Sequence, residues 1–251
     1  EPRGLADEMF SRFLYGAESR YAEPEGGNDS SVEAITRDDI VAFHTERYCP
    51  GATTLVIAGD VTVDDATRMV DGTMGRWTGG SVCSTRVIDR PAQTHRSIHL
   101  VEKRDAPQSE LRIGHVGAPR SHPDYFKLVV MNAILGGLFS SRINLNLREA
   151  HAYTYGAFSQ YDWRRGAGPF VVSTAVKSEV TDGAVREVLL EIDRMRAGEP
   201  SGEELSLATS YLDGVFPIRY ETTAANAGAL AGMVIYGLPD DYFDQYRSRI
   251  R

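Results

Sequence analysis

The segment Leu147–Ser159, "LREAHAYTYGAFS", marks a change in the secondary structure that the sequence predicts. Residues 139–150 place their apolar side chains at helical spacing, whereas residues 153–163 follow the pattern of a strand. Arg148 and Tyr155 lie seven residues apart across this corner. A rigid corner between a helix and a strand is suited to fixing the directions of two polar side chains.

Helices and strands alternate on both sides of this corner, and the strands are rich in β-branched and aromatic residues. This order predicts an α+β fold, an antiparallel sheet with helices packed on one face. The predicted strands are 52–61, 97–104, 109–119, 153–163 and 168–178. The predicted helices are 5–15, 36–48, 62–77, 121–137, 139–150, 180–198, 201–215, 224–236 and 240–251, with capping boxes at Thr36–Asp39 and Ser201–Glu204.

The composition is that of a globular protein of 251 residues, with 42% hydrophobic and 25% charged residues. A net charge of -8 makes nucleic acid and anionic membranes poor partners, because both require a basic face. The longest apolar run, Leu128–Phe139, is too short to cross a bilayer and contains Asn132, so no membrane span is predicted.

Residues 78–97 carry Gly, Pro, Ser and Thr without a lasting period, which indicates an interdomain linker. We therefore divide the chain into residues 1–80, a linker at 81–95 and residues 96–251. The chain begins and ends within helical patterns, so we expect it to be a segment of a longer protein.

Recognisable catalytic and metal-binding motifs are absent from the sequence. None of the six histidines lies in an H-E-x-x-H or H-x-x-E-H frame, and the nearest spacing, "HRSIH" at 95–99, lacks a carboxylate. Cys49 and Cys83 fit no metal-ligand spacing, and we expect two isolated thiols; a disulfide would require an oxidising compartment. We therefore predict no metal site in this chain.

Arg148 and Tyr155 allow two interpretations. They are either ordinary surface residues of a helix end and a strand, or a polar clamp. In a clamp, the guanidinium and the phenol donate hydrogen bonds to one carbonyl oxygen or developing oxyanion. We expect the polar tips to converge on an exposed concavity in the second case.

The longer stretch 134–159, "ILGGLFSSRINLNLREAHAYTYGAFS", resembles the family of pitrilysin, insulin-degrading enzyme and mitochondrial processing peptidase, the inverzincin zinc metallopeptidases, in particular its compact bacterial members. The shared features are an LGGG-like turn, S-S-R-L, L-R-E and a tyrosine seven residues after the arginine. Residues 35–62 resemble the family's segment near the end of its first homologous half. Residues 232–246 resemble the late helical stretch of its second half, so the resemblance spans nearly the whole chain in order.

This resemblance implies a duplicated α+β protein with two homologous half-units. Residues 1–80 would be the C-terminal part of a truncated first half, and residues 96–251 the second half, truncated at its end. Active members bind zinc in the first half through H-x-x-E-H and a downstream glutamate, whereas the second half supplies an arginine and a tyrosine that bind the substrate. Only Arg148 and Tyr155 carry over to this chain, and Tyr153 does not match the motif.

The function implied by the resemblance is that of a segment of a peptide-hydrolysing zinc metallopeptidase, inactive alone. Arg148 and Tyr155 would bind substrate and stabilise the tetrahedral intermediate. Zinc is expected in the full-length parent or a partner chain. The expected partners are a peptide substrate and a first-half zinc domain or separate catalytic subunit, in a homo- or heterodimer. The bacterial periplasm or cytoplasm is the expected location. The alternative is a non-catalytic structural or peptide-binding member, or a partner subunit, of the same family.

Overall fold

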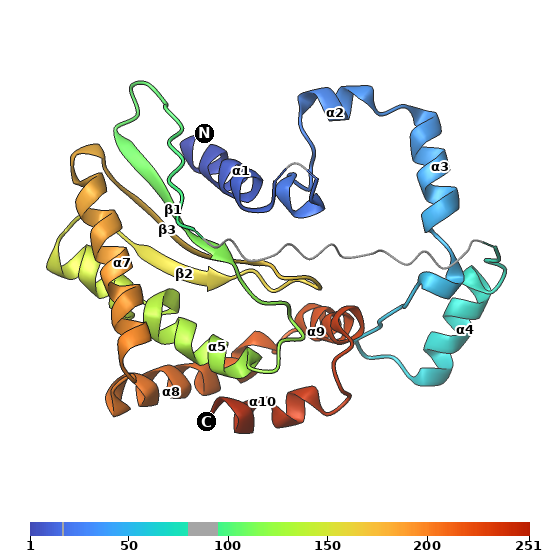
Figure 1. Cartoon of the computed structure of the whole chain (residues 1–251). Coiled ribbons are helices and arrows are strands. Elements are labelled where there is room, and N and C mark those ends of the chain that lie inside the picture. Colours follow the sequence, from blue (N-terminus) through green and yellow to red (C-terminus); the bar gives the residue numbers. More distant parts are fainter. Residues whose placement is uncertain (17, 80–94) are drawn as a thin grey trace. The chain divides into compact units, whose positions relative to one another are not determined.

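The computed structural model describes residues 1–16, 18–79 and 95–251, which fall into two compact units (Figure 1). The first unit draws on the ranges Glu1–Pro24, Ile88–Gly214 and Tyr246–Arg251. The second draws on Glu25–Val87 and Val215–Gln245.

Helices dominate both units. They are α1 (Pro2–Tyr15), α2 (Asp29–Ala34), α3 (Arg37–Arg47), α4 (Val63–Met74), α5 (Tyr125–Asn132), α6 (Arg142–Asn144), α7 (Thr181–Ala197), α8 (Gly202–Arg219), α9 (Thr223–Tyr236) and α10 (Tyr242–Ile250). Two π-helical segments, η3 (Ala133–Gly137) and η4 (Leu145–Ala150), extend α5 and α6. Short turns are η1 (Arg20–Ala22), η2 (Pro50–Ala52) and η5 (Ser178–Val180), and the strands are β1 (Gln108–Val116), β2 (Ala157–Tyr161) and β3 (Pro169–Lys177).

The sheet of the first unit is antiparallel, with strand order β1-β3-β2. Alternate residues of a strand point to opposite faces, and Phe170, Val172 and Val176 of β3 enter the hydrophobic core. Helical residues complete this core, including Ile143 and Leu147, both 0% exposed. The predicted α+β fold with a small antiparallel sheet is confirmed.

Helix α1 packs against the first strand of this sheet (Figure 1). The Arg112 guanidinium donates to Asp7 at 2.5 Å, and the Tyr15 hydroxyl donates to the carbonyl of Ala167 at 2.9 Å. A Cβ built on Gly114 would lie 3.0 Å from the Phe10 ring, so the helix approaches the strand closely there. Residues 1–24 therefore belong to the same compact unit as the sheet that follows the predicted linker.

The assignment of residues 1–80 and 96–251 to two homologous halves stays a prediction. Apart from His95, the linker predicted at 81–95 lies outside the described residues, as does Cys83. The expectation of two isolated thiols is therefore untested; Cys49 is buried.

Two of the predicted strands do not form. Residues 52–61 and 97–104 have strand-like sequences, but they pair with no strand in the described part of the chain. Ile98 and Leu100 are 94% and 93% exposed. A strand requires a neighbour for its backbone hydrogen bonds, and β-propensity alone does not supply one.

The stretch Tyr125–Ala150 has the length and mean hydropathy of a helix that could cross a membrane. Its helical structure is interrupted at 138–141, and Leu135, Ile143 and Leu147 are buried in the core of the first unit. Burial in a protein core accounts for the same composition. That the chain has no membrane span stays a prediction.

Candidate functional site

The structure places Arg148 and Tyr155 on either side of the predicted corner. Arg148 lies in η4, close to its end at Ala150. Tyr155 lies in the bend before β2, whereas we had predicted it on the strand. The Thr154 hydroxyl accepts a hydrogen bond from the Gly156 N–H at 3.1 Å. This local turn delays strand pairing until Ala157, which corrects the prediction.

The backbone of the corner is held by specific contacts. Ala152 adopts φ 53°, a left-handed conformation that costs energy for any residue with a Cβ. The Tyr153 N–H donates to the Leu147 carbonyl at 2.9 Å. The Tyr153 ring stacks on His151 at 4.9 Å, and its hydroxyl lies 3.0 Å from where a Cβ on Gly183 would be. The direction of the chain at this corner is therefore set by packing.

Two asparagines attach the helices before the corner to the strand after it. The Asn144 amide donates to the Phe139 carbonyl at 2.6 Å and accepts from the Ala157 N–H at 3.1 Å. Asn132 accepts from the Ser159 hydroxyl at 2.8 Å and donates to the Ser159 carbonyl at 3.1 Å. Leaving such buried groups without partners would cost about 1–3 kcal/mol each. These roles were not predicted from the sequence, in which the available signal is an asparagine inside an apolar helical stretch.

Arg142 and Arg148 occupy different environments. Arg142 donates two hydrogen bonds to the Glu204 carboxylate, at 2.5 and 2.8 Å. These bonds, together with those from Ser201 at the start of α8, lower the pKa of Glu204 to about 2. The Arg148 guanidinium lies 4.6 Å above the Phe139 ring and 3.2 Å from Glu149, and its side chain is 38% exposed. The Arg142 side chain thus has its hydrogen-bond partners within the fold, whereas the Arg148 side chain remains accessible to solvent.

Tyr155 is 92% exposed and lines a cavity of about 230 Å³ in the first unit. Arg148 is not among the residues that line this cavity. Within the described residues, no hydrogen bond or ion pair joins Arg148 to Tyr155, so the expected convergence of their tips stays a prediction. Neither side chain is buried in the core.

The cavity beside Tyr155 lies next to a row of sheet residues in register. Arg112 of β1 pairs with Ser173 of β3, and Ser173 with Phe158 of β2. Burial alone would lower the pKa of the Arg112 guanidinium, but hydrogen bonds to Asp7 and Glu110 outweigh burial and raise it. Arg112 is therefore a permanent charge whose partners are already in place.

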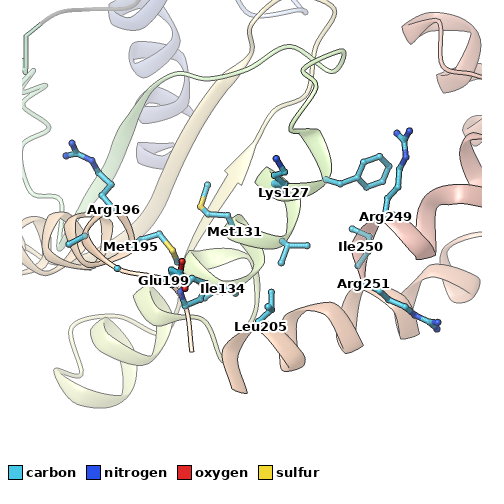
Figure 2. Close-up of a pocket in the computed structure, with 15 residues that line it drawn as sticks. Lys127, Met131, Ile134, Met195, Arg196, Glu199, Leu205, Arg249, Ile250 and Arg251 are labelled. Atoms are coloured by element: carbon cyan, nitrogen blue, oxygen red, sulfur yellow. The ribbon is translucent and has the colours of Figure 1, made fainter. Parts of the chain in front are cut away.

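A larger cavity of about 720 Å³ lies elsewhere in the first unit (Figure 2). Its apolar lining includes Met131, Ile134, Met195, Leu205 and Ile250. Neither Arg148 nor Tyr155 lines it, so size alone does not identify the candidate site.

The described ranges 1–16, 18–79 and 95–251 contain no group of three or more His, Cys, Asp or Glu side chains placed to hold a metal ion. The described residues therefore do not fit zinc.

Comparison with known proteins reveals the family. A family model described as the peptidase M16 inactive domain matches residues 34–212, more than half of the chain. A Mycobacterium leprae protein named as zinc protease ML0855 is 29% identical over 223 residues, which cover 85% of this chain and 48% of that protein. The chain thus spans about half the length of this relative.

Solved structures share the fold. The crystal structure of a peptidase M16 inactive domain from Pseudomonas fluorescens is 26% identical, with a TM-score of 0.90 over 99% of this chain and 58% of that chain. A chain in complex III2 from Candida albicans, 14% identical, has a TM-score of 0.77 over 100% of this chain and 60% of that chain. The fold therefore also occurs within a multi-subunit assembly.

The matched range crosses the boundary predicted at residue 80, and it includes Arg148 and Tyr155. The names of the relatives imply zinc in the family, although the described residues of this chain offer no site for it. The resemblance inferred from 134–159 is confirmed, and the chain belongs to the peptidase M16 family as an inactive, non-catalytic domain of a zinc-protease-like protein.

Proposed function

We propose that this chain contributes substrate contacts, through Arg148 and Tyr155, to a peptidase whose zinc is bound outside the chain. The observation that carries this proposal is the position of Tyr155. Its side chain is 92% exposed beside a cavity, and it follows a corner that Ala152 and Tyr153 hold in a strained, packed conformation. Strained backbone that is retained next to an exposed polar side chain is typical of functional sites.

Arg148 and Tyr155 offer complementary chemistry for a peptide. The guanidinium is always charged and presents several N–H donors in one plane, and the phenol donates a single hydrogen bond. Both favour a peptide carbonyl oxygen, and both gain strength as negative charge develops on it. The Phe139 ring beneath Arg148 limits the side chain's freedom without taking its donors.

Zinc in this proposal belongs to the remainder of the parent protein or to a separate catalytic subunit. It would activate the attacking water there, and this chain alone would not hydrolyse peptides. The proposed partners are therefore a peptide substrate and the polypeptide that holds the metal.

Turnover by the assembled peptidase tests the proposal. Tyr155→Phe removes one donor and little volume, so we expect a loss on the order of 10²–10³ in kcat with folding intact. Arg148→Ala should cost at least as much and also raise KM, because its charge contacts the substrate before chemistry. Tyr211→Phe is the matched control, since this exposed tyrosine of α8 lies outside the cavity lining.

If Tyr155→Phe retains full turnover in an active assembly, Tyr155 and Arg148 are surface residues and the chain is a structural member of its family. If Arg148→Lys restores most of the loss seen with Arg148→Ala, charge rather than the planar donor arrangement is what the substrate requires.

A further inference from the structure

The segment 53–58, "TTLVIA", belongs to the second unit and has the sequence of a buried strand. It lies between α3 and α4 along the chain (Figure 1). Its continuous apolar run is typical of strands that are covered on both faces. It contains no charged residue and no proline, the residues that keep an exposed strand from pairing with another. This sequence therefore favours pairing and carries nothing that prevents it.

The backbone of this segment is open to a neighbouring strand. It runs without a turn or bend, and Thr53 is extended at φ -111° and ψ 131°. Within the described residues, the N–H and carbonyl groups of 54–58 make no hydrogen bond. Successive groups of an extended strand point to opposite edges, so neither edge is occupied by a described residue.

The side chains of the segment alternate in exposure as those of a strand do. Leu55 and Ile57 are 51% and 41% exposed, whereas Val56 and Ala58 are half-buried. Alternate residues point to opposite faces, so one apolar face is partly covered and the other faces solvent. An uncovered apolar face beside open backbone groups is the kind of surface to which another strand adds.

A second copy of this chain would be a poor occupant. The described part of the second unit contains no strand, so two copies would form only a two-stranded ribbon. Such a ribbon is marginally stable in water, and a partner that brings a sheet is required. The relatives have room for one, because the match covers 48% of the Mycobacterium leprae protein and 58% of the Pseudomonas fluorescens chain.

We infer that residues 53–58 add as a strand to the edge of a β-sheet in another polypeptide. That polypeptide corresponds to the part of the relatives that this chain does not match. Main-chain hydrogen bonds would hold the strand, and apolar side chains of the partner would cover Leu55 and Ile57. The inference does not depend on Arg148 or Tyr155, and it applies equally to a chain with a purely structural role.

Amide hydrogen exchange tests the inference in the chain alone and in the assembled peptidase, which contains the chain and the polypeptide that holds the metal. In the chain alone, the amides of 54–58 should exchange at nearly the rate of an unstructured peptide. In the assembly, at least alternate amides should exchange at least about 100-fold more slowly, because a paired amide exchanges only when the strand opens. The exposed turn at 25–27 is the internal control and should exchange equally in both states.

Proline variants test whether the backbone makes the contact. Val56→Pro and Ile57→Pro each remove one N–H, and the two N–H groups point to opposite edges. At least one variant should lower the fraction of chain that elutes with its partner in gel filtration by at least about 10-fold. Ile57→Val keeps the N–H and the branched side chain and is the matched control. Urea unfolding of each variant chain alone should be unchanged, because 54–58 have no described backbone bond to lose.

Equal exchange of 54–58 in the chain alone and in the assembly would overturn the inference, and this measurement decides even if a proline variant fails to fold. Slow exchange in the chain alone would also overturn it. Sedimentation would then show whether the strand is paired within a monomer or between two copies. Tyr155→Phe should leave the exchange of 54–58 unchanged, so the failure of this inference and the failure of the proposed function are distinguishable.

Discussion

Two regions of the molecule form helices with equally clear local sequence signals but differ in how far their side chains are buried. They are residues 108–214 and residues 29–74. In the first region, Ile143, Leu147 and Val172 are at most 1% exposed. In the second, α2, α3 and α4 contain no buried residue, and Ile40 and Phe43 are each 59% exposed. The difference shows that a capped, amphipathic sequence is sufficient to define a helix and insufficient to define a core.

The two regions differ because their helices are stabilised in different ways. Helices shorter than about 12–15 residues are marginal in water unless an apolar face packs against something. The α3 helix has 11 residues and α4 has 12, and each begins at a threonine N-cap. Within the described chain these two helices depend on local hydrogen bonds, whereas the helices around the sheet depend on burial.

The strongest test compares one isoleucine from each region. Ile143→Ala removes a fully buried side chain, so we expect the free energy of unfolding to fall by about 2–5 kcal/mol. Ile40→Ala removes an exposed one and should change it by less than about 0.5 kcal/mol. Urea unfolding followed by Trp163 fluorescence in a Trp77→Phe background reports on Ile143→Ala in the first unit, and Trp77 fluorescence in a Trp163→Phe background reports on Ile40→Ala in the second. Equal losses in both variants would contradict the contrast in packing.

The next test concerns the ion pair that joins α6 to α8. Glu204 has a folded-state pKa of about 2, below its ordinary value of 4.5, because Arg142 donates to it. Its stabilisation is therefore fully present above pH 4.5 and is lost as the pH falls toward 2. Glu204→Gln should cost roughly 1.5 kcal/mol at pH 7.

The difference in the free energy of unfolding between Glu204→Gln and the unmutated chain should become smaller as urea unfolding is repeated at successively lower pH, starting from pH 4.5. Glu203→Gln, also in the first turn of α8, is the control and should show no such pH dependence. If this difference in the free energy of unfolding does not change with pH, the ion pair does not contribute to stability through its charge.

The next prediction concerns the N-terminal cap of α3, in the region of residues 29–74. The Thr36 hydroxyl accepts from the Asp39 N–H at 3.2 Å, so Thr36→Ala should destabilise α3 by about 1 kcal/mol. Because no buried side chain holds α3, the loss should appear as faster amide hydrogen exchange confined to 37–47. Thr45→Ala, which removes a hydroxyl bonded to the Val41 carbonyl within the same helix, should leave that exchange nearly unchanged. Unchanged exchange in Thr36→Ala would show that packing, not the cap, holds this helix.

The smallest effect is expected at the corner. Ala152→Gly relieves a left-handed backbone that costs roughly 1–2 kcal/mol, and glycine's greater freedom in the unfolded chain offsets about 0.5–1 kcal/mol of this gain. We expect a net stabilisation of about 0.5 kcal/mol in urea unfolding. Ala150→Gly, in the preceding helical turn, should destabilise instead. If both substitutions destabilise equally, the corner is not strained.

Some features could be predicted from local sequence because they depend on neighbouring residues only. The capping boxes at Thr36–Asp39 and Ser201–Glu204 form as expected, since a side chain and the amide three residues later meet whenever the helix begins there. The corner after Arg148 and the family resemblance likewise followed from contiguous motifs.

Other features could not be read from the sequence because they depend on distant partners. Residues 52–61 and 97–104 have strand propensity but pair with no strand among the described residues. Tyr155 lies before the strand because Thr154 closes a local turn. The bonds of Asn144 to Ala157 depend on a fold that turns the chain back on itself.

Local sequence thus defines the helices, their caps and the two candidate residues, because these depend on contacts within one or two turns. The environment of those residues is a tertiary property. The cavity beside Tyr155 exists because α1 meets a strand more than a hundred residues later through Asp7 and Arg112. Arg142 is paired because Glu204 arrives from a distant helix, whereas among the described residues Arg148 has an ion pair only with its chain neighbour Glu149. Such pairings depend on how the whole unit closes around its core, and no local pattern encodes them.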